Sequence, residues 1–152
     1  MGLQEQIAAD LVAAMKAKDK VRVDTLRMVK AAMKTQQVEP GRDAAQPLDD
    51  AAAVTVLMKL MKQRKESIEV FGQNNRQDLV DKEQAELAII EEYLPAAVTP
   101  EEIEQAVAEA IAEVGATSAK QMGQVMSKVL PRFAGRPVDG KQVSAVVKAK
   151  LG

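Results

Sequence analysis

The side chains best suited to binding a phosphate are concentrated near the C-terminus. The RNA-binding candidates are Lys120, Gln124, Lys128, Arg132, Arg136, Lys141 and Lys148. The first four of them recur at intervals of four, so a helix would carry them as one ridge. A cationic ridge neutralises phosphates, and this one has no aromatic side chain on which an unpaired base would stack. The ridge therefore favours a folded, double-stranded RNA, and a face that only keeps the protein soluble is the alternative.

Charge is distributed unevenly along a chain that is nearly neutral overall. The sequence has 21 basic and 22 acidic side chains, which excludes a uniformly basic polyanion binder. From residue 115 onward, seven basic residues stand against one acid, Asp139. A second basic block lies between residues 16 and 34, where seven basic residues stand against Asp19 and Asp24. Most of the acids are concentrated between these blocks, in the third to fifth predicted helices.

The composition excludes most familiar catalytic chemistry. The chain has no cysteine and no histidine, so disulfides, thiolate or imidazole metal ligands, and imidazole-based triads are excluded. Proton transfer would fall to Asp, Glu, Lys or the single tyrosine, Tyr93. We predict no catalytic residue, no metal site and no cofactor, and a non-enzyme is the favoured interpretation.

Two glycine-containing segments near the C-terminus could each have a structural role, and one of them could instead bind phosphate. The stretch from Gly135 to Lys141 has the glycine and lysine spacing of a phosphate-binding loop. Such a loop follows a strand and continues with Ser or Thr, whereas here a helical segment precedes it and Gln142 follows. We interpret the stretch as a loop and a helix N-cap at Asp139. Gly123, in the sixth predicted helix, is expected to allow a close approach to a neighbouring helix.

Helical residues dominate the sequence. Apolar residues make up 47% of it and aromatic residues only 2%, so cores must be built from small, helix-spaced side chains. Thr99, with Glu102 three residues later, predicts a capped helix start, and the same spacing follows Ser118 and Asp139. We predict an all-α protein in two parts, a four-helix N-terminal domain over residues 1–95 and a three-helix C-terminal domain over residues 99–152.

The third and fourth predicted helices have a register that follows from their apolar residues. If the two helices pack antiparallel about the turn between them, Leu60 lies opposite Ile90. The same register places Arg64 opposite Glu86, and each of these charges interrupts an apolar stripe. We interpret Arg64 and Glu86 as a partly buried structural ion pair. Glu83 shares a face with Glu86, and a metal site there is the less favoured alternative.

Motifs along most of the chain resemble one family. They include Lys62–Ser67, Arg76-x-Asp78-Leu79, Tyr93-Leu94-Pro95, Met122-Gly123-x-Val125-Met126 and Asp139-Gly140-x-x-Val143. Together they resemble the YqeY-like proteins of the GatB/YqeY family. That family is similar to the helical tail of the B subunit of the tRNA-dependent Asp/Glu amidotransferase. The tail's Gly-Gln-Val-Met stretch corresponds to residues 123–126, and its basic positions correspond to Arg136 and Lys148.

The resemblance implies a non-catalytic module that binds tRNA or another structured RNA. It also implies an amidotransferase or an aminoacyl-tRNA synthetase as protein partner. Two alternatives remain open: an accessory with carbon–nitrogen ligase activity that uses glutamine as amido donor, and a protein-interaction adaptor. The sequence shows no signal-type stretch and no membrane-spanning run, so we expect no membrane association and a cytoplasmic location.

Overall fold

The structure is a computed structural model that describes residues 2–152. Within these residues it contains seven α-helices, two short 3-10 helices and no strand, which confirms the predicted all-α class. The chain divides into two compact units, an N-terminal unit that ends at Leu94 and a C-terminal unit, Pro95–Gly152. Four α-helices belong to the first unit and three to the second.

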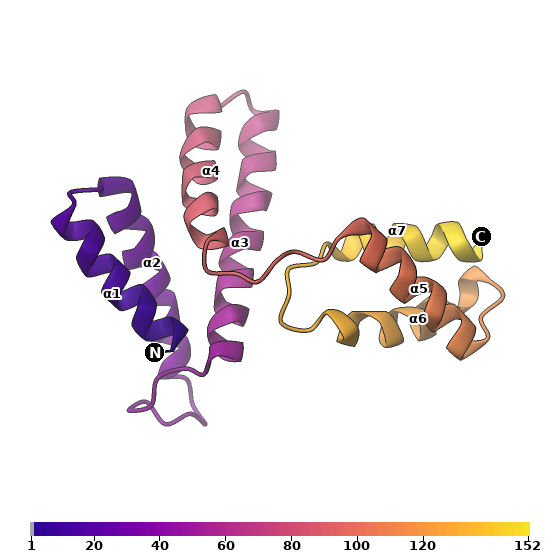
Figure 1. Ribbon diagram of the computed structural model, residues 1–152. Coiled ribbons are helices and arrows are strands. Elements are labelled where there is room, and N and C mark those ends of the chain that lie inside the picture. The colour runs from indigo at the N-terminus through magenta and orange to yellow at the C-terminus, as the bar shows by residue number, and fades with distance from the viewer. Residues whose placement is uncertain (1) are drawn as a thin grey trace. The chain divides into compact units, whose positions relative to one another are not determined.

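The N-terminal unit consists of two helical hairpins. Its helices are α1 (Leu3–Lys16), α2 (Lys20–Gln37), α3 (Asp50–Gln73) and α4 (Gln77–Glu91). Figure 1 shows α1 beside α2 and α3 beside α4. The side chain of Asp19 accepts a hydrogen bond from the Arg22 N–H at the start of α2, and Asp49 caps α3 in the same way. Lys18 in the first tight turn and Asn75 in the second adopt left-handed backbone angles.

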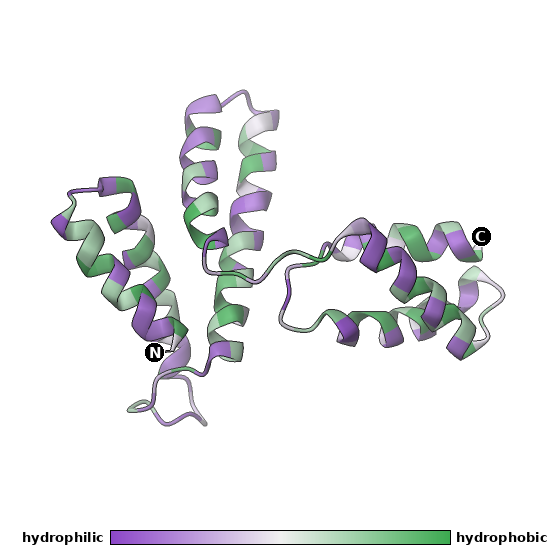
Figure 2. Ribbon diagram, in the orientation of Figure 1, coloured by the Kyte–Doolittle hydropathy of each residue, from purple (hydrophilic) through white to green (hydrophobic). Residues whose placement is uncertain are grey.

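The core of the N-terminal unit is aliphatic and draws on all four helices. Its fully buried large side chains include Ile7 of α1, Leu26 of α2, Leu57 of α3 and Ile90 of α4. Figure 2 shows these helices with hydrophobic residues along one side and hydrophilic residues along the other, as the periodicity of the sequence requires. Tyr93, after α4, donates a hydrogen bond of 2.6 Å to Asp10 of α1. Partial burial and this carboxylate raise the pKa of Tyr93.

The C-terminal unit packs three α-helices around a second core. It contains α5 (Pro100–Val114), η1 (Ala119–Gln121), α6 (Met122–Val129), η2 (Leu130–Phe133) and α7 (Gly140–Leu151). Thr99 and Glu102 form the predicted capping box, and α5 ends at Gly115, which has a positive φ of 73°. The core consists mainly of valine and alanine, with Ile103 and Phe133 as its largest members. Asp139 caps α7 by accepting a hydrogen bond from the Lys141 N–H.

The sixth helix differs from its prediction. The side chain of Ser118 makes no capping hydrogen bond, and a 3-10 turn precedes α6. Gln121 Oε1 accepts a hydrogen bond of 2.8 Å from the Thr117 N–H rather than from the Ser118 N–H that a capping box requires. Pro131 lies in η2 and ends the α-helix, as expected of proline. The expectation for Gly123 is wrong: the residue is exposed, and a Cβ atom added there would meet no other atom within 4 Å.

Candidate nucleic-acid interface

Acidic side chains of α5 neutralise part of the predicted cationic ridge. Lys128 of α6 lies 3.4 Å from Glu113, and Arg132 of η2 lies 2.6 Å from Glu109. Both ion pairs are explained by antiparallel packing of α5 against α6. Glu109 and Glu113 are one helical turn apart on α5, and their partners, Arg132 and Lys128, are one turn apart on the facing segment. These side chains are about half exposed, so each pair contributes little to stability.

Arg136 is fixed by the fold of the C-terminal unit. Its guanidinium binds both carboxylate oxygens of Glu102, over 2.5 Å and 3.0 Å. The same group donates to the carbonyl oxygens of Ala96 and Ala97, over 3.1 Å and 3.2 Å. We call these contacts the Arg136 clasp. It ties the loop before α7 to the segment that enters α5, and its geometry leaves few donors for a phosphate.

The clasp makes the stability of the C-terminal unit depend on pH. The Arg136 guanidinium, with the Thr99 N–H, lowers the pKa of Glu102 from 4.5 to about 2. A carboxyl whose pKa is lower when folded stabilises the fold above its unfolded pKa and loses that contribution as pH falls toward its folded pKa. We therefore expect stability to fall between pH 4.5 and about 2, and Glu102→Gln to remove part of this loss. Urea unfolding at a series of pH values measures it.

Glu104 provides the matched control for this titration. It lies on the same helix, is exposed and forms none of the ion pairs found within residues 2–152. Glu104→Gln should therefore leave the acid limb of the stability curve unchanged. An identical pH dependence for Glu102→Gln and the unmodified protein would show that the clasp does not couple folding to this carboxyl.

The remaining predicted RNA-binding residues carry no acidic partner. Within residues 2–152, the ion pairs do not include Lys120, Lys141 or Lys148. Lys141 and Lys148 lie two turns apart on one exposed face of α7. Lys120 lies on η1, which contacts α7, and Gln124 is exposed on α6. Among the predicted RNA-binding residues, Lys120, Lys141 and Lys148 are therefore the positive charges that no acidic side chain compensates within residues 2–152.

The acids of α5 change the net charge of this part of the molecule. From residue 115 onward the sequence carries seven basic residues and one acid, but the C-terminal unit as a whole carries seven basic and six acidic residues. The whole unit is therefore close to neutral. Recognition of a polyanion would have to depend on where the unpaired lysines lie rather than on bulk charge.

Arg64 and Glu86 are brought together inside the N-terminal unit. Arg64 Nε of α3 lies 3.5 Å from Glu86 and 3.9 Å from Glu83, both on α4. The three side chains are only 14 to 20% exposed. Arg64 Nε has no hydrogen bond, and the guanidinium also contacts the sulfur of Met28 on α2. The arrangement joins three helices, α2, α3 and α4.

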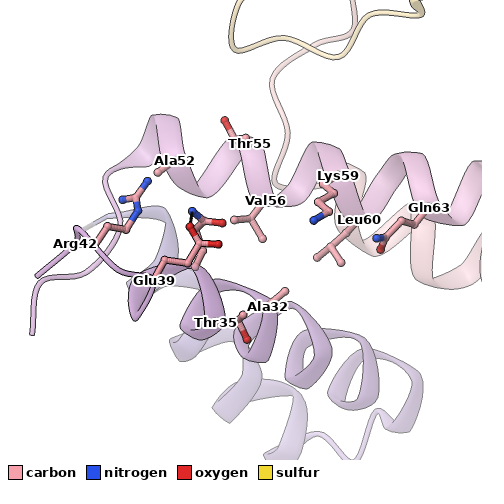
Figure 3. Close-up of a pocket in the computed structure, with 11 residues that line it drawn as sticks. Ala32, Thr35, Glu39, Arg42, Ala52, Thr55, Val56, Lys59, Leu60 and Gln63 are labelled. Carbon is pink, nitrogen blue, oxygen red and sulfur yellow. Dashed lines mark hydrogen bonds between the residues drawn. The ribbon is translucent and has the colours of Figure 1, made fainter. Parts of the chain in front are cut away.

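A cleft of about 410 Å³ lies between α2, the loop after it and α3. Figure 3 shows apolar residues of α2 and α3, among them Ala32, Val56 and Leu60, together with the charged side chains of Arg42 and Lys59. Glu39 at one end accepts a hydrogen bond from Gln36. The cleft is lined by one carboxylate, Glu39, and by two hydroxyls, those of Thr35 and Thr55, which donate to the carbonyl oxygens of Ala31 and Ala51.

The structure also bears on the phosphate-loop-like segment, on metal binding and on membrane spans. The segment from Gly135 to Lys141 follows a 3-10 helix, and Asp139 uses its carboxylate as a helix cap. Within residues 2–152, no three His, Cys, Asp or Glu side chains are grouped closely enough to hold a metal ion. Across the same residues, every helix is too short or too polar to span a membrane.

Comparison with known proteins identifies relatives along nearly the whole chain. A family model described as Yqey-like protein matches residues 4–151. The chain is 33% identical to the "Altered inheritance of mitochondria protein 41, mitochondrial" of Pyrenophora tritici-repentis, over 97% of this chain and 80% of that protein. The protein of the same name from Lachancea thermotolerans is 35% identical, over 93% of this chain and 75% of its own length. The Eremothecium gossypii protein of that name is 42% identical over 57% of this chain and 46% of its own length.

The predicted cytoplasmic location is wrong. The three relatives compared above are named as mitochondrial proteins, and these names contradict a cytoplasmic location. The prediction depended on the lack of a signal-type stretch and of a membrane-spanning run, and proteins of the cytosol and of the mitochondrial interior share both properties. Composition alone therefore does not separate the two compartments.

Proposed function

The chain belongs to the Yqey-like protein family, and from that premise we propose that it binds structured RNA, transfer RNA first, without catalysing a reaction itself. The contacts we propose are Lys120, Gln124, Lys141 and Lys148, with Lys128 at the margin. Arg132 and Arg136 are left out of this set because they are engaged by Glu109 and Glu102. An amidotransferase or an aminoacyl-tRNA synthetase remains the proposed protein partner.

The observation that supports this proposal is the uncompensated charge of Lys120, Lys141 and Lys148. The unit has six acids for its seven cations, yet the ion pairs involve the cations at residues 128, 132 and 136 and not these three. The lysines are exposed and have no stacking side chain beside them, because the only aromatic residue of the C-terminal unit, Phe133, is buried. A surface of this kind reads the phosphates of a folded RNA rather than its bases.

Salt dependence of tRNA affinity tests the proposal. For the unmodified protein, the logarithm of the association constant should fall with the logarithm of salt concentration by about 0.7 to 0.9 per phosphate contact. The triple variant Lys120→Glu, Lys141→Glu, Lys148→Glu should lower that slope by about 2 to 3 and weaken binding to every tRNA alike. Fluorescence anisotropy with a labelled tRNA transcript at several salt concentrations measures both.

The matched control carries the same change of charge in the N-terminal unit. Lys62, Lys65 and Lys82 are exposed lysines of α3 and α4 that form none of the ion pairs found within residues 2–152. Their triple replacement by glutamate should leave the slope unchanged. Absence of tRNA binding by the unmodified protein at low salt would reject the function. An unchanged slope in the first variant would reject these three lysines as the site. Glutamine-dependent release of ammonia would favour the ligase alternative.

A further inference from the structure

A second cationic surface runs along the outer face of α2. Its members are exposed, lie on one helix and have no acidic partner, and we call them the α2 stripe: Lys20, Arg27, Lys30 and Lys34. The first, second and fourth are spaced seven residues apart, which is close to two helical turns. They therefore align in a row about 21 Å long, at 1.5 Å per residue.

The buried residues of α2 determine which side of the helix the stripe occupies. Leu26, Val29 and Met33 are fully buried against the other helices of the N-terminal unit. Helical spacing puts Lys20, Arg27 and Lys34 well away from these three, and all four members of the stripe are exposed. The row is thus held on a packed scaffold and does not depend on a flexible loop.

The cations of the α2 stripe are not neutralised by acidic side chains, in contrast to several cations of the C-terminal unit. The helix carries a single acid, Asp24, and within residues 2–152 Asp24 forms no ion pair. Asp19, just before the helix, uses its carboxylate to cap it. The one cation of α2 with an acidic partner is Arg22, which meets Glu92. On the α6 ridge, by contrast, Lys128 and Arg132 both face acids of α5.

The side chains around the stripe favour an RNA over a lipid surface. A helix that lies in a membrane interface presents large apolar residues beside its cations, so that they can enter the acyl region. The two large apolar residues exposed on and next to α2, Val21 and Val38, lie at its two ends, while Asp24 and Ala31 lie among the cations. A row of cations whose large exposed apolar neighbours lie only at its ends suits phosphates along a backbone better than the acyl region of a membrane.

We propose that the α2 stripe is a second contact surface for the same folded RNA, formed by the N-terminal unit and bound through the phosphate backbone. This inference rests on the proposed function. It adds to that function a site with four unpaired cations, which is more than Lys120, Lys141 and Lys148 provide in the C-terminal unit. The RNA that fits has an accessible duplex segment long enough to follow a row of about 21 Å.

Charge reversal on α2 tests the inference in the full chain. In the variant Lys20→Glu, Arg27→Glu, Lys34→Glu, the salt slope of tRNA binding should fall by about 2 to 3. The neutral variant Lys20→Gln, Arg27→Gln, Lys34→Gln keeps residues that favour helix and should lower the slope by nearly as much. Circular dichroism verifies that both variants fold. The triple lysine variant at residues 62, 65 and 82 again serves as control and should bind like the unmodified protein.

The outcomes separate this inference from the function on which it rests. Binding of tRNA by the unmodified protein, with an unchanged slope in both α2 variants, would overturn the α2 stripe and leave the C-terminal contacts standing. Absence of tRNA binding by the unmodified protein would overturn both. Vesicles of phosphatidylserine and phosphatidylcholine provide the third arm. Sedimentation with these vesicles that depends on the stripe, without binding to tRNA, would replace the RNA by a lipid surface.

Discussion

Replacement of Arg64 by alanine is expected to lower the free energy of unfolding of the N-terminal unit by about 3 kcal/mol. The guanidinium lies 3.5 Å from Glu86 and 3.9 Å from Glu83, and all three side chains are mostly buried. Its removal leaves two carboxylates close together in a poorly hydrated space between α3 and α4, where their repulsion is weakly screened. It also removes the contact with Met28 of α2. Urea unfolding followed by circular dichroism measures the loss.

A compensated variant separates this effect from a general loss of packing. Replacing Arg64 by methionine, Glu86 by leucine and Glu83 by glutamine removes the charges while it keeps the volume. Such replacements of buried ion pairs are often neutral or stabilising. The triple variant should therefore recover most of the stability that Arg64→Ala loses. A loss below about 1 kcal/mol for Arg64→Ala would mean that the group behaves as an ordinary surface ion pair.

Ile103→Ala is expected to unfold the C-terminal unit. Ile103 of α5 is fully buried in a core that consists mainly of valine and alanine, so its side chain is a large share of the core volume. Truncation of a buried isoleucine to alanine costs about 2 to 5 kcal/mol. A core in a unit as short as Pro95–Gly152 supplies only about 3 to 5 kcal/mol in total. The loss is thus comparable to the whole stability of the unit.

Amide hydrogen exchange distinguishes unfolding of one unit from unfolding of the chain. The two cores share no residue, so amides of α5 and α7 should lose protection in Ile103→Ala while those of α2 and α3 keep theirs. Ile111→Ala is the matched control, because Ile111 lies on the same helix but is only partly buried. It should be tolerated. Full protection of α5 in Ile103→Ala would show that this unit is more stable than its size indicates.

Most helix boundaries could be predicted from the sequence because they are local. A cap needs only a few neighbouring residues, and Asp19, Asp49, Thr99 and Asp139 all begin helices by accepting a backbone hydrogen bond. The start of the sixth helix was mispredicted because the donor that Gln121 satisfies belongs to Thr117, outside the expected capping box. The same spacing of a capping residue and a glutamine thus precedes a 3-10 turn after Ser118 and an α-helix after Asp139.

The partners of the predicted site residues could not be derived from the same local patterns. The ridge on α6 was defined by spacing within one helix, while its neutralisation depends on which face of α5 packs beside it. A signal was present: Glu102, Glu109 and Glu113 share one face of α5, and an antiparallel register brings them to Arg136, Arg132 and Lys128. Bulk charge over a segment is therefore a poor guide until the packing partner of each helix is known.

The hydrogen bond from Tyr93 to Asp10 has a practical consequence for experiments on this protein. The chain has one tyrosine and no tryptophan, so its intrinsic fluorescence comes almost entirely from Tyr93. A phenol that donates to a carboxylate emits differently from a hydrated one, so the signal reports contact between α1 and the end of α4. Tyr93 is not part of the C-terminal core, so we expect unfolding of that core to lower the far-ultraviolet signal while the hydrogen bond to Asp10 persists. Tyr93 thus gives a signal for the N-terminal unit by itself, without any attached label.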